Sequence, residues 1–132
     1  MLAPEEKLKL EPKPYLAATP RFASGADTPR AFLERCLADL SALEPKIGAF
    51  VHLNIDAARV AADQAGARWR DGSPRSPIDG MPVGIKDIIE TADMPTENGS
   101  PLFAGFRSER DADSVAALRE AGAVIVGKTV TT

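Results

Sequence analysis

"SVAALREAGAVIV", residues 114–126, carries the strongest fold signal in the sequence. Val115 and Leu118 recur at helical spacing, and the glycine that follows predicts the end of that helix. Residues 123–126 show no alternation of apolar and polar side chains, which is typical of a strand covered on both faces in a parallel sheet. Another strand is predicted upstream over "VGIKDII", residues 83–89. Strand, helix and doubly covered strand together predict an α/β fold.

Two amphipathic helices are predicted before this unit. Thr28 followed by proline is a strong helix start, and apolar residues recur at helical spacing from there until Gly48. The alanine-rich stretch 57–70 predicts a second helix packed closely against another element. Residues 49–53 between them fit either a short strand or the approach to the second helix. Residues 1–27 contain several prolines and little periodicity, so an extended N-terminal arm is predicted there, followed by a domain over 28–132.

Composition excludes several classes of protein. The chain has 132 residues, 44% of them apolar and 27% charged, which is typical of one globular domain. The net charge of −3, with both signs interspersed, gives no reason to expect a nucleic acid or an anionic membrane as partner. A single cysteine excludes an internal disulfide and fits a cytoplasmic protein. A single histidine argues against a His-rich metal site and a Ser-His-Asp triad, and no cofactor or metal is predicted.

"GAVIVGKT", residues 122–129, matches the phosphate-binding pattern G-x-x-x-x-G-K-[ST] in its letters. A phosphate-binding loop lies between a strand and a following helix, whereas here the inner residues are themselves the predicted strand and the helix precedes them. We therefore predict that this segment binds no nucleotide. Lys128 within it is expected to be dispensable for activity as long as the protein folds.

Lys86 stands in the middle of an apolar run, "DGMPVGIKDIIE", residues 79–90. In a strand, Gly84 and Lys86 lie on one face and Asp87 on the other, so the lysine and the aspartate need separate partners. One interpretation is a lysine whose ammonium group reaches solvent. The other is a desolvated lysine that can act as a base near neutral pH. The spacing of the residues does not decide between these interpretations.

Residues 79–132 resemble the amidase signature family. "DGMPVGIKD" is similar to the family's Gly-(Ile/Met/Val)-Pro-x-x-x-Lys-Asp block, and "TADMPTENGSPLFAG" to the loop that follows it. "RDADSVAALREAGAVIVGKT" is similar to the next helix–strand unit. The resemblance implies the N-terminal part of an amidase fold, with a mixed sheet covered by helices, which ends before the family's Gly/Ser-rich serine motif.

The family hydrolyses carboxamide C–N bonds with a serine nucleophile, a second serine in a cis peptide, and a lysine. The resemblance maps the lysine onto Lys86, with Asp87 as structural support. Neither catalytic serine has a counterpart here, so we expect residues 1–132 alone to be inactive and to need the C-terminal portion of an amidase. The serines that fail to match are Ser24, Ser41, Ser73, Ser76, Ser100, Ser108 and Ser114.

The substrate within the family stays open at this point. A simple carboxamide, allophanate, and the glutamine used by an aminoacyl-tRNA amidotransferase are all compatible with the sequence, and the last would bring partner subunits and tRNA. A homo-oligomer is also compatible. The alternative from another class is a non-catalytic amidase remnant, or a fragment that interacts with a partner.

Overall fold

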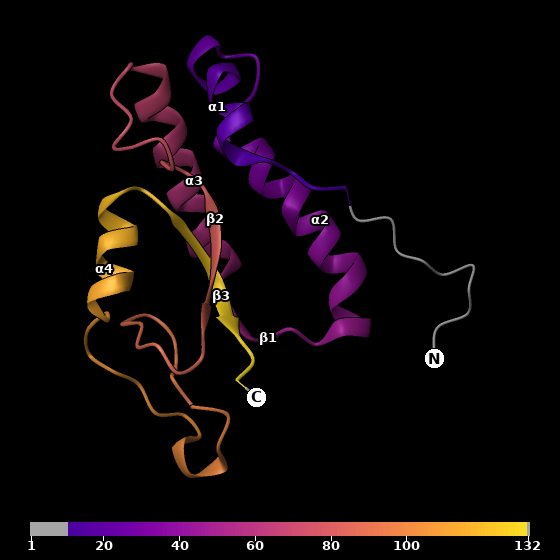
Figure 1. The fold of residues 1–132 in the computed structure, drawn as a ribbon, viewed down its shortest axis with the longest axis vertical. Helices are drawn as coiled ribbons and strands as arrows, with labels where there is room; N and C mark the ends of the chain where they lie inside the picture. The colour runs from indigo at the N-terminus through magenta and orange to yellow at the C-terminus, as the bar shows by residue number, and fades with distance from the viewer. Residues whose placement is uncertain (1–10, 132) are drawn as a thin grey trace.

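The computed structural model describes residues 11–131, which form a small mixed sheet with helices on both faces (Figure 1). The strand order is β1-β3-β2; β1 runs antiparallel to β3, and β2 runs parallel to it. The predicted mixed α/β fold is therefore confirmed. The elements in chain order are α1 Tyr15–Ser24, α2 Pro29–Ile47, β1 Phe50–Leu53, α3 Ile55–Arg70, β2 Pro82–Lys86, the 3₁₀ helix η2 Pro101–Phe103, α4 Asp113–Glu120 and β3 Val124–Thr129.

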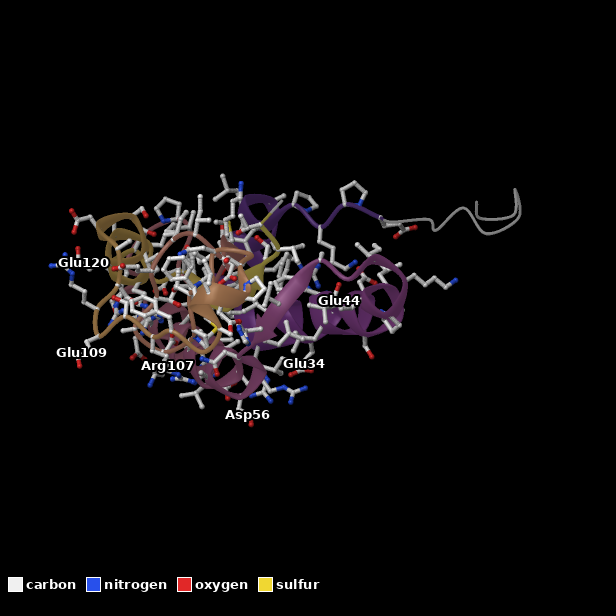
Figure 2. The ribbon with its side chains drawn as sticks, turned by 90° about the horizontal axis from the view of Figure 1, so that it is seen from below. Glu34, Glu44, Asp56, Arg107, Glu109 and Glu120 are labelled. Carbon is white, nitrogen blue, oxygen red and sulfur yellow. The ribbon has the colours of Figure 1, made fainter. Side chains whose placement is uncertain are left out.

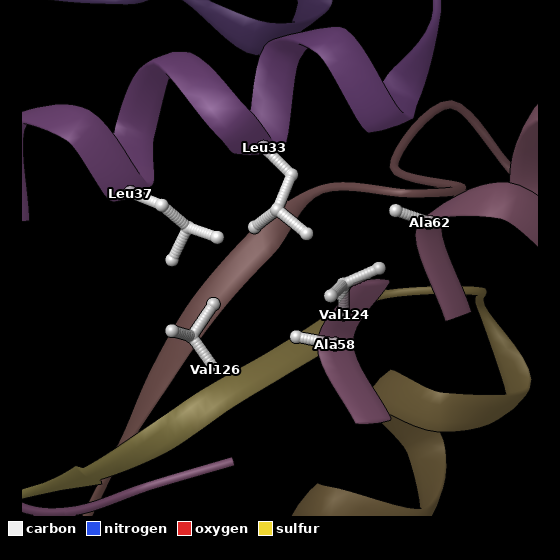
Figure 3. Packing of buried hydrophobic residues seen from close by; sticks show 6 residues of the cluster. All are labelled: Leu33, Leu37, Ala58, Ala62, Val124 and Val126. Atoms are coloured by element: carbon white, nitrogen blue, oxygen red, sulfur yellow. The ribbon is translucent and has the colours of Figure 1, made fainter. Parts of the chain in front are cut away.

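β3 is the central strand, and its first five residues are buried. On one face, Val124 and Val126 pack against Leu33 of α2 and against alanines of α3 (Figure 3). On the other face, Ile125 packs against Val115 of α4. A strand covered on both faces is what the unalternating 123–126 stretch predicts, and the β2–α4–β3 order confirms the predicted parallel unit.

The start of α2 follows the sequence signal. The Thr28 hydroxyl accepts a hydrogen bond from the backbone N–H of Ala31, and a proline occupies the first turn. The helix ends at Gly48, whose φ of 61° is left-handed. The next residues form β1, so the stretch left open between strand and helix approach is an edge strand.

α1 corrects the prediction of an extended arm over residues 1–27. A proline inside a helix removes one backbone hydrogen bond, and Pro20 therefore conceals this helix in the sequence. The carbonyl of Leu16, four residues before the proline, instead accepts a hydrogen bond from the Thr19 hydroxyl at 2.9 Å. Tyr15 and Phe22 bury the helix against aromatic side chains of α2 and α3. Residues 1–10 of the predicted arm lie outside the described residues.

The long connection between β2 and α4 runs away from the sheet at the end where both parallel strands finish (Figure 1). Charged side chains of both signs surround the molecule, including Asp56 on α3 and Glu120 on α4 (Figure 2). This distribution agrees with the interspersed charges of the sequence. Among the described helices, none is long and apolar enough to cross a membrane.

Candidate active site

Lys86 is the last residue of β2. Its backbone pairs with Thr129 of β3, and its carbonyl accepts a hydrogen bond from the N–H of Ile89 in the turn that follows. The strand is thus shorter than the predicted 83–89 and ends at the lysine. Ligands of α/β folds bind at the carboxyl ends of the parallel strands. Lys86 therefore stands where such a fold places its functional side chains.

The side chain of Lys86 is exposed, as is Gly84 two residues earlier. Residues two apart in a strand share a face, so both belong to the side of the sheet that α2 and α3 cover farther along. A Cβ built on Gly84 would come within 3.0 Å of Thr129 Cγ2 and 3.5 Å of Phe50 Cε1. Because glycine has no Cβ, the side chains of Thr129 in β3 and Phe50 in β1 can pack close to β2 beside the lysine. No hydrogen bond joins Lys86 to a serine among residues 11–131.

An apolar hollow of about 210 Å³ lies beside this face. Leu33 and Leu37 of α2 form one wall, and Val83 and Gly84 of β2 form the other. Cys36 also lines it, and burial raises the pKa of its thiol above the ordinary value. A thiol of raised pKa is a poor nucleophile, so Cys36 is better explained as a packing residue of this apolar wall.

The side chain of Lys128, in contrast to that of Lys86, is fully buried, with an exposed fraction of 0%. Its Nζ donates to Thr96 Oγ1 at 2.8 Å and to the carbonyl of Pro95 at 3.0 Å. Asp87 Oδ1 lies 3.6 Å from the same nitrogen. Burial lowers the pKa of Lys128 below its ordinary value, and the Asp87 carboxylate opposes that shift.

The burial of Lys128 bears on the expectation that this residue is dispensable as long as the protein folds, because a substitution there would disturb the fold itself. Replacing it by alanine would leave the Asp87 carboxylate buried beside a cavity without its cation. The segment that matches the nucleotide-binding pattern cannot wrap around a phosphate group, because residues 124–129 form β3 and their backbone groups pair with β1 and β2. The sequence offered one usable sign of the burial: Lys128 lies only two residues after the end of the apolar stretch 123–126.

Asp87 is buried and supports the loop that follows β2. Its Oδ1 accepts a hydrogen bond from the N–H of Glu97, and its carbonyl accepts one from the N–H of Asn98. Its own N–H donates to the carbonyl of Thr129 at 2.9 Å. Asp87 Oδ2 accepts no hydrogen bond from the described residues. The geometry agrees with structural support, the part that the resemblance assigns to Asp87.

Glu97 ties the same loop to β1. Its Oε1 accepts a hydrogen bond from His52 Nε2 at 2.5 Å, and its Oε2 accepts one from the N–H of Gly105 at 2.6 Å. Those two donors hold the pKa of Glu97 below its ordinary value, the backbone donor contributing most. His52 is thus half-buried and joins β1 to this loop. Within residues 11–131 no group of three or more His, Cys, Asp or Glu side chains is arranged to hold a metal ion.

The mixed sheet places Lys86 at the carboxyl end of β2, which is where open α/β sheets bind their ligands. A family model described as Amidase matches residues 31–132. This chain therefore belongs to the amidase family, the amidase signature enzymes, and the resemblance seen in the sequence is confirmed.

Individual relatives agree with that assignment. The chain is 46% identical over 112 residues to a glutamyl-tRNA(Gln) amidotransferase subunit of Chloroflexus aggregans, a match that covers 85% of this chain and 23% of that protein. It is 43% identical over 106 residues to the corresponding subunit of Anaeromyxobacter sp. (strain K), covering 80% of this chain and 22% of that one. Peptide amidase from Stenotrophomonas maltophilia superposes with a TM-score of 0.79 at 33% identity, covering 96% of this chain and 25% of the other. The chain thus spans about a quarter of the length of these relatives.

Proposed function

We propose that these residues supply the general base, Lys86, to an enzyme that hydrolyses a carboxamide C–N bond. The observation that carries the proposal is the position of Lys86: it ends β2 at the carboxyl edge of the sheet, on an open face, within the block that resembles the family's lysine motif. A structural lysine would be expected to have its ammonium group bonded to the fold, as Lys128 has. Lys86 makes no such bond within residues 11–131, so its amine is free to meet other groups.

The chemistry requires two serines that residues 1–132 do not supply. In the mechanism that the resemblance implies, a neutral lysine accepts a proton through a bridging serine, and the nucleophilic serine then attacks the amide carbon. Several serines of this chain have structural contacts instead: the Ser76 hydroxyl donates to the carbonyl of Ala121, and that of Ser108 donates to Glu90. We propose that both catalytic serines belong to residues outside 1–132 and that 28–132 is the N-terminal portion of the amidase domain. The relatives, about four times as long, support this.

Among the substrates left open by the sequence, glutamine is favoured. The curated relatives cited above are glutamyl-tRNA(Gln) amidotransferase subunits, and their identity to this chain, 43–46%, exceeds that of the peptide amidase, 33%. In this role the protein would release ammonia from glutamine and pass it to a partner subunit that modifies aminoacyl-tRNA. The net charge of −3 gives these residues no electrostatic part in holding the tRNA. A cytoplasmic location stays a prediction.

A simple carboxamide is the second candidate, supported by the superposition with peptide amidase at a TM-score of 0.79. The two candidates differ in whether partner subunits change the rate. An amidotransferase subunit is expected to release ammonia from glutamine faster when its partner subunits and charged tRNA are present. A free-standing amidase is expected to hydrolyse short carboxamides at a rate that added subunits leave unchanged.

The test is ammonia release by the natural-length protein, assayed with glutamine and with a short primary amide. Wild-type protein is expected to release ammonia from one of the two, and Lys86→Ala from neither, at unchanged circular dichroism and melting temperature. Unchanged activity in Lys86→Ala would overturn the role given to Lys86. A correctly folded wild type that releases ammonia from no amide, with or without partner subunits, would favour the non-catalytic remnant instead.

A further inference from the structure

We propose that Lys128 is a positioning residue for the reaction: it holds the turn behind Lys86 through Asp87 and the loop at residues 95–98. This inference rests on the proposed function, since it assigns Lys128 to the support of the base. Lys128 lies on the face opposite to Lys86 and is not proposed to touch the substrate. What it controls is the position of the backbone that carries Lys86.

The first step is the contact of Lys128 with the loop. Its Nζ donates to the Pro95 carbonyl at 3.0 Å and to the Thr96 hydroxyl at 2.8 Å, and Thr96 is itself buried. These residues are more than thirty positions away in the sequence, so the contact joins the end of β3 to the loop after β2. Water cannot replace these hydrogen bonds at a nitrogen with no exposed surface.

The second step is the contact of the loop with Asp87. Glu97 and Asn98 directly follow the segment that Lys128 holds, and their N–H groups donate to Asp87 Oδ1 at 3.2 Å and to the Asp87 carbonyl at 3.1 Å. Lys128 Nζ also lies 3.6 Å from Asp87 Oδ1. The aspartate is therefore held from its side chain and its main chain by one loop, and Lys128 anchors the buried side of that loop while Glu97 joins it to β1.

The third step is the link from Asp87 to Lys86, which is covalent. Lys86 pairs with Thr129, and the next N–H along the chain, that of Asp87, donates to the Thr129 carbonyl at 2.9 Å. A shift of the aspartate or of the loop would therefore move the end of β2 and the lysine on it. A displacement of about 1 Å at a catalytic group can cost on the order of 100-fold in rate.

The opposite end of β2 offers a matched control. Asp79, just before the strand, is buried, and Arg68 binds both of its carboxylate oxygens at 2.6 and 2.7 Å. This pair also joins a buried aspartate to a cation from another element. Seven residues of largely extended chain separate it from Lys86, roughly 20 Å. A variant of Arg68 therefore destabilises the protein by the same kind of change without touching the turn after Lys86.

The experiment compares Lys128→Met with Arg68→Met in the natural-length protein, with the amide it hydrolyses. Each variant is assayed well below its own melting temperature. Lys128→Met is expected to lower kcat by about 100-fold and leave KM within about twofold, since only the base is displaced. Arg68→Met is expected to lower the melting temperature comparably and leave kcat within about threefold. Equal losses of kcat in the two variants would overturn the proposal and show general destabilisation.

A milder variant keeps the test decisive if Lys128→Met fails to fold. Thr96→Val has nearly the same shape and removes one acceptor of the buried ammonium group. It is expected to lower kcat about three- to tenfold and to speed hydrogen exchange at the Glu97 and Asn98 amides. Wild-type exchange together with wild-type kcat would overturn the proposal. Because exchange needs no activity, a failure of the proposed function, seen as active Lys86→Ala, remains distinguishable from a failure of this inference.

Discussion

The guanidinium group of Arg68 binds both carboxylate oxygens of Asp79, which has no exposed surface. The backbone N–H of Arg75 donates to the same carboxylate at 2.9 Å, and the indole N–H of Trp69 donates to the Asp79 carbonyl at 2.8 Å. The aspartate thereby joins the end of α3 to the start of β2. The pair lies before the N-terminal end of β2, at the end of the strand opposite to Lys86.

We predict that Arg68→Ala lowers the free energy of unfolding by about 3 kcal/mol, because it leaves a buried carboxylate without its cation. Arg30→Ala is the control, since Arg30 pairs with Glu34 and Asp63 at the surface. Exposed pairs of that kind contribute about 0–1 kcal/mol. Urea unfolding of both variants measures the difference, and equal losses would contradict the importance given to the Asp79 site.

Gly122 should be as sensitive as Arg68. Its φ of 94° disfavours any side chain, and a Cβ there would lie 2.1 Å from Asp79 Oδ1. We expect Gly122→Ala to cost about 3 kcal/mol, the sum of backbone strain and displacement of the buried carboxylate. Gly72→Ala is the matched control: its φ is also positive, at 70°, but nothing lies within 4 Å, so it should cost about 1 kcal/mol. Similar melting temperatures for the two variants would refute the close contact.

The sequence predicted the elements whose signals are local. The unalternating 123–126 stretch and the helix before it sufficed for the parallel unit, and the cap at Thr28 sufficed for α2. α1 was not predicted because Pro20 disfavours a helix in its own sequence. The aromatic contacts that stabilise α1 come from side chains of α2 and α3. Local propensity is overridden where tertiary packing supplies more energy.

The sequence predicted only that part of the candidate site whose signal is local. The local pattern predicts a strand over 83–89 that contains Lys86, and the structure ends that strand at the lysine instead. The partnership of Lys128 joins residues about thirty or more positions apart, and the pattern around it resembled a phosphate loop. One indication was present: Asp87, predicted on the face opposite to Lys86, needed a partner of its own, and the strand that pairs with β2 contains Lys128.

Acid should loosen the loop that Glu97 holds. The pKa of Glu97 is lowered in the folded state. Its contribution to the stability of the folded protein is therefore fully present at pH values above the unfolded pKa near 4.5, and it is lost as the pH falls through the lower folded pKa. We expect hydrogen exchange at the Gly105 amide, corrected for the intrinsic rate, to increase as pH falls below about 4. Glu97→Gln should exchange faster at neutral pH and lose this acid dependence. A pH-independent protection in the wild type would contradict the role of the carboxylate.

Nucleotides should leave the protein unchanged, although residues 122–129 match the phosphate-loop pattern. The backbone amides of β3 are paired within the sheet, and Lys128 Nζ is directed at Pro95 and Thr96. A phosphate group would find neither free amides nor the ammonium group there. We expect millimolar ATP or GTP to leave the melting temperature unchanged, with and without Mg²⁺. A saturable upward shift would show a binding site that this geometry does not provide.

Lys86→Arg is the substitution that separates a base from a surface charge. A base must lose its proton near pH 7, and a guanidinium group cannot because its pKa lies far above neutral pH, so Lys86→Arg should be nearly as inactive as Lys86→Ala. Members of such a catalytic set act as a unit, and we expect losses of several powers of ten in kcat/KM. If Lys86 only carries a charge to solvent, arginine carries it equally well and the variant should keep its activity.

The control for this substitution is Lys46→Arg, the same exchange at an exposed lysine near the end of α2. Lys128 cannot serve as this control, because it is fully buried and a substitution there would disturb the fold. Lys46→Arg should keep wild-type kcat/KM, because Lys46 is given no part in the reaction. Kinetics of the three variants, measured in the natural-length protein at matched melting temperatures, decide the matter. If Lys86→Arg were as active as Lys46→Arg, Lys86 would not be the base, because a guanidinium group cannot take the proton of the nucleophile.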